Sequence, residues 1–144
     1  MNFTFRASKE ADHARIHAVW AASVRATHDF LSEADFSEIS DLVRDVYVPN
    51  AEFLVAEQEG QVVGFMGMTD LKIDSLFIAP SVFGQGLGRA LVEQARKVGR
   101  PLLVDVNEQN SGAVAFYQRL GFKQVGRTET DDAGRPYPIL EMSE

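Results

Sequence analysis

The strongest constraint on this fold is a glycine-rich loop between an apolar run and an amphipathic stretch, LFIAPSVFGQGLGRALVEQA. The apolar run Leu76–Ile78 is typical of a buried strand, and it stops before Pro80. Gly84, Gly86 and Gly88 then precede the amphipathic stretch. Glycines let backbone N–H groups approach a ligand, and a helix N-terminus favours an anion. The loop predicts either a phosphate or pyrophosphate site or a turn that only lets the helix pack closely.

The stretch after the glycines is predicted to be one helix with one buried face. Its apolar residues recur at helical spacing. Gly99 and Pro101 are expected to end it. The spacing G-x-G-x-G differs from a Rossmann fingerprint, and the Gly-Lys-Ser/Thr of a Walker loop is missing from the sequence. The predicted buried residues are Leu87, Ala90, Leu91, Ala95 and Val98.

Composition narrows the class of protein. The chain has 144 residues, which predicts a single domain over residues 1–144. Its net charge of −7 argues against non-specific binding to nucleic acid. It contains no cysteine, which excludes a thiol nucleophile and thiolate metal sites. The N-terminal segment does not resemble a signal peptide, and no apolar run approaches the length of a membrane span. We therefore expect a cytoplasmic protein that does not bind membranes.

The remaining patterns predict an α/β fold with the order β-α-α-β-β-β-α-β-α-β-β. About seven strands would form a mixed central sheet, flanked by about four helices. Ser8 is the expected N-cap of a first helix that ends near Val24, and Ala34–Val46 is the expected second helix. Asn110 is the expected N-cap of the last helix, which Gly121 ends. The predicted strands are Asn2–Ala7, Phe53–Glu57, Gln61–Thr69, Lys72–Ile78, Leu102–Val106, Phe122–Thr130 and Tyr137–Met142.

A second motif follows the glycine loop, and the two together carry a family resemblance. The segment VNEQNSGAVAFYQRLGF fits the pattern N-x-x-A-x-x-F-Y-x-x-x-G-F. With a loop close to [Q/R]-x-x-G-x-G/A, the chain resembles the Gcn5-related N-acetyltransferase (GNAT) superfamily, especially its small stand-alone bacterial members. The element order is also that of the family. The residues that match the second motif are Asn110, Ala113, Phe116, Tyr117, Gly121 and Phe122.

The resemblance implies acetyl-CoA as co-substrate. We expect no metal, and we expect direct attack by a primary amine in a ternary complex, because the sequence contains no cysteine for an acetyl-enzyme. The resemblance also implies that the backbone of Leu76, Phe77 and Ile78 pairs with the pantetheine arm. Phe83 stands where the family usually has Arg or Gln, so the backbone amides would carry most of the diphosphate contact. The implied acetyl-CoA-binding residues are Leu76, Phe77, Ile78, Phe83, Gly84, Gln85, Gly86, Leu87, Gly88, Arg89, Asn110, Phe116 and Tyr117.

Two residues are candidates for the chemistry. Tyr117 matches the family's tyrosine, and a phenol with a pKa near 10 can donate a proton to a departing thiolate. Asp105 is the one charge in the strand LLVDV. It matches a carboxylate base of ribosomal-protein acetyltransferases in the same superfamily. It could accept the amine's proton, attract an ammonium group, or be a solvated residue at the strand end.

The acceptor side is the least defined part. His28, Asp29 and Phe30 lie in a segment that borders the acceptor in this fold, so they are substrate-binding candidates. The acceptor would be a small-molecule amine or a peptide or protein amine. His13 and His17 share a helix face, but no third ligand is evident for a metal. A non-catalytic CoA-binding sensor and another kind of phosphate-loop protein are the alternatives. A monomer and a homodimer are both compatible with the sequence.

Overall fold

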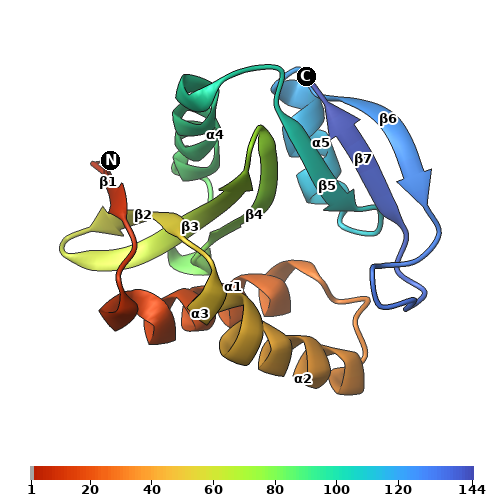
Figure 1. Cartoon of the computed structure of the whole chain (residues 1–144), viewed down its shortest axis with the longest axis horizontal. Helices are drawn as coiled ribbons and strands as arrows, with labels where there is room; N and C mark the ends of the chain where they lie inside the picture. The colour runs from red at the N-terminus through yellow and green to blue at the C-terminus, as the bar shows by residue number, and fades with distance from the viewer. Residues whose placement is uncertain (1) are drawn as a thin grey trace. The chain divides into compact units, whose positions relative to one another are not determined.

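The computed structural model describes residues 2–144, which form two compact units (Figure 1). The first unit comprises residues 2–67 and 75–91, and the second comprises residues 68–74 and 92–144. The strands pair in the order β1-β2-β3-β4-β5-β7-β6. This seven-stranded mixed sheet and the order of helices between its strands confirm the predicted fold class.

The first unit contains an antiparallel meander. Its strands are β1 (Thr4–Ala7), β2 (Phe53–Gln58) and β3 (Gln61–Thr69). Glu59 and Gly60 join β2 to β3, and both have positive φ, 54° and 77°, as a tight two-residue hairpin requires. The turn predicted from the Glu-Gly pair is therefore confirmed.

Helices α1 (His13–Thr27) and α2 (Glu33–Leu42) follow β1. A 3₁₀ turn, Glu10–Asp12, precedes α1. The predicted N-cap Ser8 is wrong. Its hydroxyl accepts a hydrogen bond from the Phe53 N–H at 3.0 Å. The carboxylate of Asp12 instead accepts from the Lys9 N–H at 2.9 Å.

The second predicted helix is longer and less regular than expected. After α2 the chain continues as a π-helical turn, Val43–Tyr47, and a short helix α3, Val48–Asn50. Leu42 and Val46 of the predicted apolar face are 49% and 55% exposed. A π turn shifts the angular phase of the side chains, so a face counted at 3.6 residues per turn does not persist through it.

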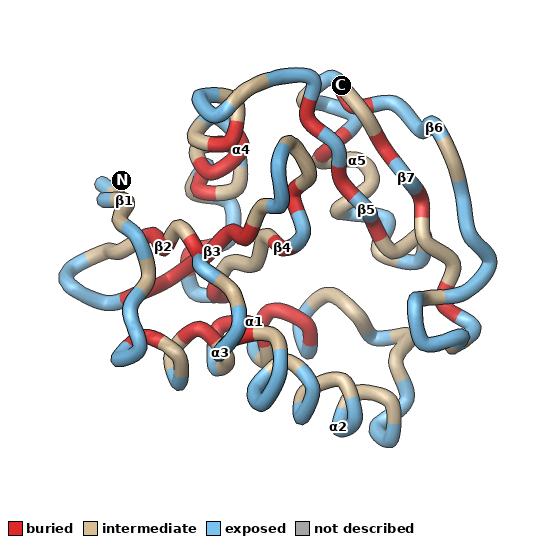
Figure 2. The backbone as a smooth tube through the Cα atoms, in the orientation of Figure 1, coloured by how far each residue is buried: buried red, intermediate tan, exposed pale blue. Residues whose placement is uncertain are grey.

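A row of four aromatic rings, of which Phe53 and Phe65 are buried, passes through the first unit. Phe53 and Phe65 meet edge to face with 5.3 Å between ring centroids, and Phe77 lies 5.7 Å beyond Phe65. Tyr47 contacts the other side of Phe53 at 5.3 Å. Figure 2 shows the buried part of β3 running through this region. Rings in these arrangements stabilise the sheet beyond the area that they bury.

The second unit pairs the start of β4 (Lys72–Ile78) with β5 (Leu103–Asn107) in parallel. Next to β5 lie β7 (Ile139–Ser143) and β6 (Lys123–Thr128), both antiparallel to their neighbours. Helix α5 (Ser111–Arg119) contacts β5. The predicted C-terminal hairpin is confirmed.

Helix α4 (Leu87–Val98) contains residues of both units and ends before Gly99 as predicted. Its predicted buried face is confirmed at Leu87, Leu91 and Ala95. The prediction that Val98 is buried is wrong, because this residue ends the helix and is 67% exposed. Val92, which the spacing did not single out, is fully buried instead.

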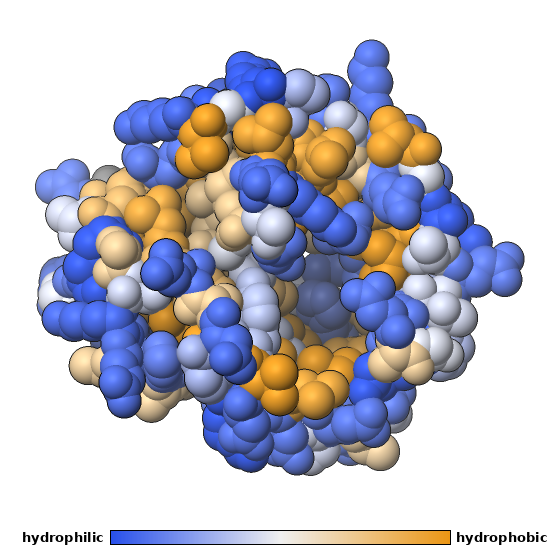
Figure 3. All heavy atoms as spheres, viewed as in Figure 1, coloured by the Kyte–Doolittle hydropathy of each residue, from blue (hydrophilic) through white to orange (hydrophobic). Residues whose placement is uncertain are grey.

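The surface is largely hydrophilic on the face shown in Figure 3, with apolar patches between the polar side chains. Within residues 2–144, no helix combines the length and the apolarity that crossing a membrane requires.

The first unit is packed closely around Gly67, so a substitution there measures the effect of that packing on stability. A Cβ at Gly67 would lie 2.7 Å from Tyr47 Oη and 2.9 Å from Ser75 Oγ, two hydroxyls that are hydrogen-bonded to each other at 2.8 Å. We expect Gly67→Ala to lower the free energy of unfolding by about 1–3 kcal/mol, because overpacking displaces that pair. Urea unfolding followed by circular dichroism measures it.

Gly112→Ala is the matched control, because its Cβ would meet only Asn110 Oδ1, at 3.8 Å. Alanine is a better helix former than glycine, so this variant should be unchanged or slightly more stable. Equal midpoints for Gly67→Ala and the wild type would contradict the packing argument.

Candidate active site

The glycine loop turns the chain sharply between β4 and α4. A 3₁₀ turn, Pro80–Val82, follows β4, and the Phe83 N–H donates to the Pro80 carbonyl at 3.2 Å. Gly84 and Gly86 then adopt φ of +77° and +82°. Side chains disfavour this left-handed region, so glycine is required at both positions.

The loop presents a run of backbone amides that have no acceptor within the described residues. The first backbone hydrogen bond of α4 is donated by Ala90 to the Gly86 carbonyl at 3.0 Å. The preceding N–H groups, from Gly84 to Arg89, have no acceptor within residues 2–144. A Cβ built on Gly84 or Gly86 meets no atom within 4 Å, so the loop is open to a ligand. The first turn of α4 contains no acidic residue that would repel an anion.

The loop's side chains contribute less than its backbone. Phe83 is 44% exposed and carries no charge. Arg89 is exposed in the first turn of α4. Gln85 Oε1 is enclosed and has no donor within the described residues. An enclosed acceptor without a donor costs free energy, so this loop is suited to a partner that residues 2–144 do not supply.

The end of β4 precedes this loop. Parallel pairing of β4 with β5 joins Lys72 to Leu103 and Ile73 to Val104. Leu76–Ile78 lie beyond these pairs in β4, and all three are half-buried. The strand predicted to hold the pantetheine arm is therefore present with the predicted bounds.

Tyr117 lies on α5 and is 6% exposed. Its ring is 4.9 Å from that of Phe116 and 5.3 Å from that of Phe122, both edge to face. Burial raises the pKa of Tyr117 above its ordinary value. Within residues 2–144 the hydroxyl makes no hydrogen bond, so no other residue competes for its proton. Such a phenol stays protonated at neutral pH and can act as an acid.

Asn110 caps α5 as the sequence predicts. Its Oδ1 accepts from the Ala113 N–H at 3.2 Å, and its carbonyl accepts from the Val114 N–H at 3.1 Å. Gly121, with φ of +98°, ends the helix. The cap fixes the start of the helix that carries Tyr117.

Asp105 is ion-paired. Its Oδ2 lies 2.6 Å from Lys72 Nζ, and the two side chains are 42% and 41% exposed. The hydrogen bond to Asp105 raises the pKa of Lys72. Glu141 on β7 is the cross-strand partner of Asp105, and its carboxylate lies against Gly126 of β6. Sequence reasoning missed Lys72 because the register between parallel strands cannot be read from the sequence.

The acceptor-side candidates lie at the end of α1. His28 is the C-cap residue of α1, and its ring is 5.2 Å from that of Phe30. His28 Nδ1 is 2.7 Å from the Thr27 hydroxyl, which donates to the Ser23 carbonyl at 2.8 Å. Burial lowers the pKa of His28, and the nearby charge of Asp29 opposes that shift. Asp29 is exposed.

His17, one of the two histidines on α1, is engaged with neighbouring side chains. His17 Nε2 lies 2.9 Å from Ser40 Oγ, and its ring stacks on Trp20. Within residues 2–144, no group of three or more acidic or histidine side chains is arranged to hold a metal ion.

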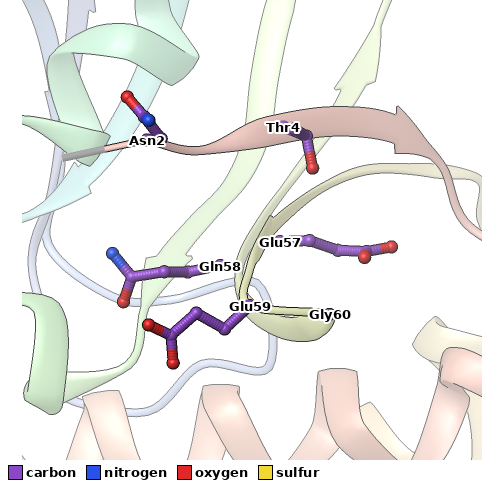
Figure 4. Close-up of a pocket in the computed structure, with 6 residues that line it drawn as sticks. All are labelled: Asn2, Thr4, Glu57, Gln58, Glu59 and Gly60. Atoms are coloured by element: carbon purple, nitrogen blue, oxygen red, sulfur yellow. The ribbon is translucent and has the colours of Figure 1, made fainter.

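A hollow of about 610 Å³ lies elsewhere in the first unit, between β1 and the β2–β3 turn. Figure 4 shows its polar lining, Asn2, Thr4, Glu57, Gln58, Glu59 and Gly60. None of these residues belongs to the predicted site. The hollow is open and its acidic side chains disfavour an anion, so it is no substitute for the glycine loop.

Comparison with known proteins places this geometry in a family. The acetyltransferase (GNAT) domain matches residues 49–124. The peptidyl-lysine N-acetyltransferase YjaB of Salmonella typhimurium is 46% identical over 99% of this chain and 98% of its own. The chain therefore belongs to the GNAT acetyltransferases and is an acetyl-CoA-dependent N-acetyltransferase. The resemblance read from the two motifs is confirmed.

Comparison with solved structures supports the same family assignment. The solution structure of apo-form YjaB from Escherichia coli has a TM-score of 0.94 at 46% identity, covering 99% of this chain and 97% of its own. PaiA N-acetyltransferase from Thermoplasma acidophilum, solved in complex with coenzyme A, has a TM-score of 0.79 at 20% identity, with 98% of both chains covered. The second likeness establishes the fold alone.

The loop geometry generates a binding prediction. We expect Gly86→Ala to weaken acetyl-CoA binding at least tenfold by calorimetry, because alanine disfavours the left-handed φ by about 1–2 kcal/mol and redirects the loop amides. Gly134→Ala is the control. Gly134 has φ of +79° in the C-terminal hairpin and its Cβ would also meet nothing within 4 Å, so it carries the same strain. Equal loss of affinity in both variants would contradict a role specific to the loop.

Proposed function

We propose that this N-acetyltransferase acetylates lysine side chains of peptides or proteins by direct attack in a ternary complex. The observation that carries the proposal is the 46% identity, over nearly the whole of both chains, to an enzyme named for peptidyl-lysine. The acidic chain, with a net charge of −7, suits a cationic acceptor. A neutral amine attacks a thioester directly, and the sequence contains no cysteine that could carry the acetyl group.

The acceptor class is tested with a panel. Purified protein and acetyl-CoA are incubated separately with a single-lysine peptide whose N-terminus is blocked, a lysine-free peptide with a free N-terminus, spermidine and free amino acids. Release of CoA thiol and mass spectrometry identify the product. Preference for the blocked lysine peptide supports the proposal. Acetylation of the other amines alone would refute it, and binding of acetyl-CoA without turnover would favour the sensor alternative.

Acetyl-CoA would be held chiefly by main-chain groups. Within the loop Phe83–Arg89, we propose that the amides of Gly84–Arg89 bind its diphosphate, because they lack acceptors within residues 2–144 and lead into a helix N-terminus. The Phe83 N–H, which was also predicted to bind it, already donates to the Pro80 carbonyl. The backbone of Leu76–Ile78 would pair with the pantetheine arm, as the family resemblance implies. Asn110 and Phe116 remain proposed contacts from α5. The bound thioester supplies the activated acetyl group.

Tyr117 is the proposed general acid. Its phenol is protonated at neutral pH and has no hydrogen-bond partner within residues 2–144. In the reaction it would donate its proton to the departing sulfur. Burial keeps this proton in place over a wider pH range than for a solvated tyrosine, because it raises the pKa.

We expect Tyr117→Phe to lower kcat about 100-fold while the Kd for acetyl-CoA changes less than twofold, because only the proton donor is lost. Steady-state kinetics and calorimetry measure the two quantities. Tyr137→Phe, a change at another buried tyrosine of the same unit, should keep kcat within a factor of about two. Unchanged turnover in Tyr117→Phe would remove Tyr117 from the chemistry.

Asp105 is proposed to bind the acceptor's ammonium group. Its carboxylate already binds such a group, that of Lys72. Both side chains are half exposed, where an ion pair is weak and exchanges readily. An acceptor lysine would therefore replace Lys72 at Asp105. The alternative, in which Asp105 takes the proton, predicts a different kinetic signature.

We expect Asp105→Asn to raise KM for the lysine peptide several-fold while kcat falls less than threefold, because ammonium binding is lost and the chemistry is retained. Asp74→Asn is the control, since Asp74 is an exposed acid on the adjacent strand that binds the Thr69 hydroxyl. A turnover rate that falls about 100-fold at constant KM would identify Asp105 as the base instead.

A further inference from the structure

His28 has the arrangement of a base whose tautomer is fixed. A hydroxyl has one proton to donate, and that of Thr27 goes to the Ser23 carbonyl at 2.8 Å. The contact of 2.7 Å between Thr27 Oγ1 and His28 Nδ1 must then be donated by the imidazole. The proton of neutral His28 therefore resides on Nδ1, and Nε2 carries a lone pair.

The surroundings keep that lone pair available. His28 is half-buried beside Phe30, and within residues 2–144 no group bonds to its Nε2. The pKa of His28 lies below its ordinary value because burial disfavours the charged form. Asp29 is the charged group that acts on it, and its effect is the smaller. The ring is therefore neutral at pH 7. The backbone of His28 is held at the end of α1, since its N–H donates to the Val24 carbonyl at 2.8 Å.

We propose that His28 Nε2 removes the proton from the acceptor's ammonium group, with Thr27 as the positioning residue. The proposal rests on the proposed function, because it needs an amine that arrives protonated. The Asp105 carboxylate is already engaged with the Lys72 ammonium, whereas the Nε2 lone pair of His28 has no partner within residues 2–144. An oriented, neutral imidazole is the usual general base near pH 7.

The proton balance is complete. An N–H bond of the ammonium group breaks and an Nε2–H bond forms, which leaves a neutral amine. The amine's electron pair forms the C–N bond to the acetyl carbonyl, and the C–S bond breaks with its electron pair on sulfur. Sulfur takes the proton of Tyr117, which the second proton from the nitrogen replaces through solvent. His28 releases its proton to solvent, so the products are an amide, CoA thiol and one proton.

The pH dependence of kcat/KM separates this role from a structural one. The test uses whichever amine of the panel the wild type acetylates, taking the lysine peptide first. Because His28 deprotonates the ammonium form, wild-type kcat/KM should be nearly constant from pH 7 to 9. His28→Gln must use the free amine, whose fraction rises about tenfold per pH unit below a pKa of about 10.4. Its kcat/KM should be about 100-fold lower at pH 7 and approach the wild type near pH 9.

Matched variants complete the test. His13→Gln, a half-exposed histidine at the start of the same helix, should retain the wild-type profile. Thr27→Val should lower kcat/KM several-fold at every pH, and Thr27→Ser should restore it. A flat profile in His28→Gln, or a loss that is equal from pH 7 to 9, would overturn the proposal. An enzyme that acetylates no amine would instead overturn the proposed function.

A second measurement needs no turnover. Nitrogen-15 NMR of the histidine side chains distinguishes the two neutral tautomers. We expect His28 to show protonated Nδ1 in the wild type and a mixture of tautomers in Thr27→Val. A protonated Nε2 in the wild type at pH 7 would overturn the proposal even if His28→Gln fails to fold.

Discussion

The positive φ of Gly84 and Gly86 is the constraint on which the site depends. These two residues reverse the chain within a few positions, so that an apolar strand ends and α4 begins with unpaired amides. Neither glycine is needed to relieve crowding, because a Cβ at either position would point into open space. Both glycines instead allow the positive φ angles that turn the backbone, and this turn sets the direction of the amide N–H groups.

The proposed chemistry is divided among groups with different electrostatic environments. The Tyr117 phenol is buried and stays protonated, whereas the Asp105 carboxylate is half exposed and already neutralised by Lys72. The His28 imidazole is half-buried and neutral, and its hydrogen bond to the Thr27 hydroxyl orients it. The proposed acid, cation-binding group and base therefore differ from one another in burial and in hydrogen bonding.

Local sequence signals predicted most of the fold. The bounds of β3 and β4 agree residue for residue with the expectation, and α4 ends before Gly99 as expected, because turns, proline and glycine mark these ends. The prediction for Ser8 was wrong because its hydroxyl binds Phe53, which is distant in sequence. The prediction for Val98 was wrong because this residue is the last of α4 and is exposed. The π turn after α2 has no recognised local signature. The prediction of a single domain stays a prediction, since the structure shows two compact units.

The candidate site was only partly readable from the sequence. The motifs located Tyr117 and the glycine loop, but the Lys72–Asp105 pair depends on strand register. The link from Thr27 to His28 was in principle detectable, because the residues are adjacent at the predicted end of a helix. The tautomer of His28 can be assigned only from the structure, because it follows from the hydrogen bond that the Thr27 hydroxyl donates to the Ser23 carbonyl.

Phe83 carries one more consequence. Its ring is uncharged and 44% exposed, so the diphosphate binding proposed for the loop would depend on the path of the main chain. A binding surface of that kind would keep its affinity when its side chains are substituted, but it would lose affinity when either of its two positive-φ glycines is substituted. Homologous loops could therefore diverge widely in side-chain chemistry and still retain the same nucleotide.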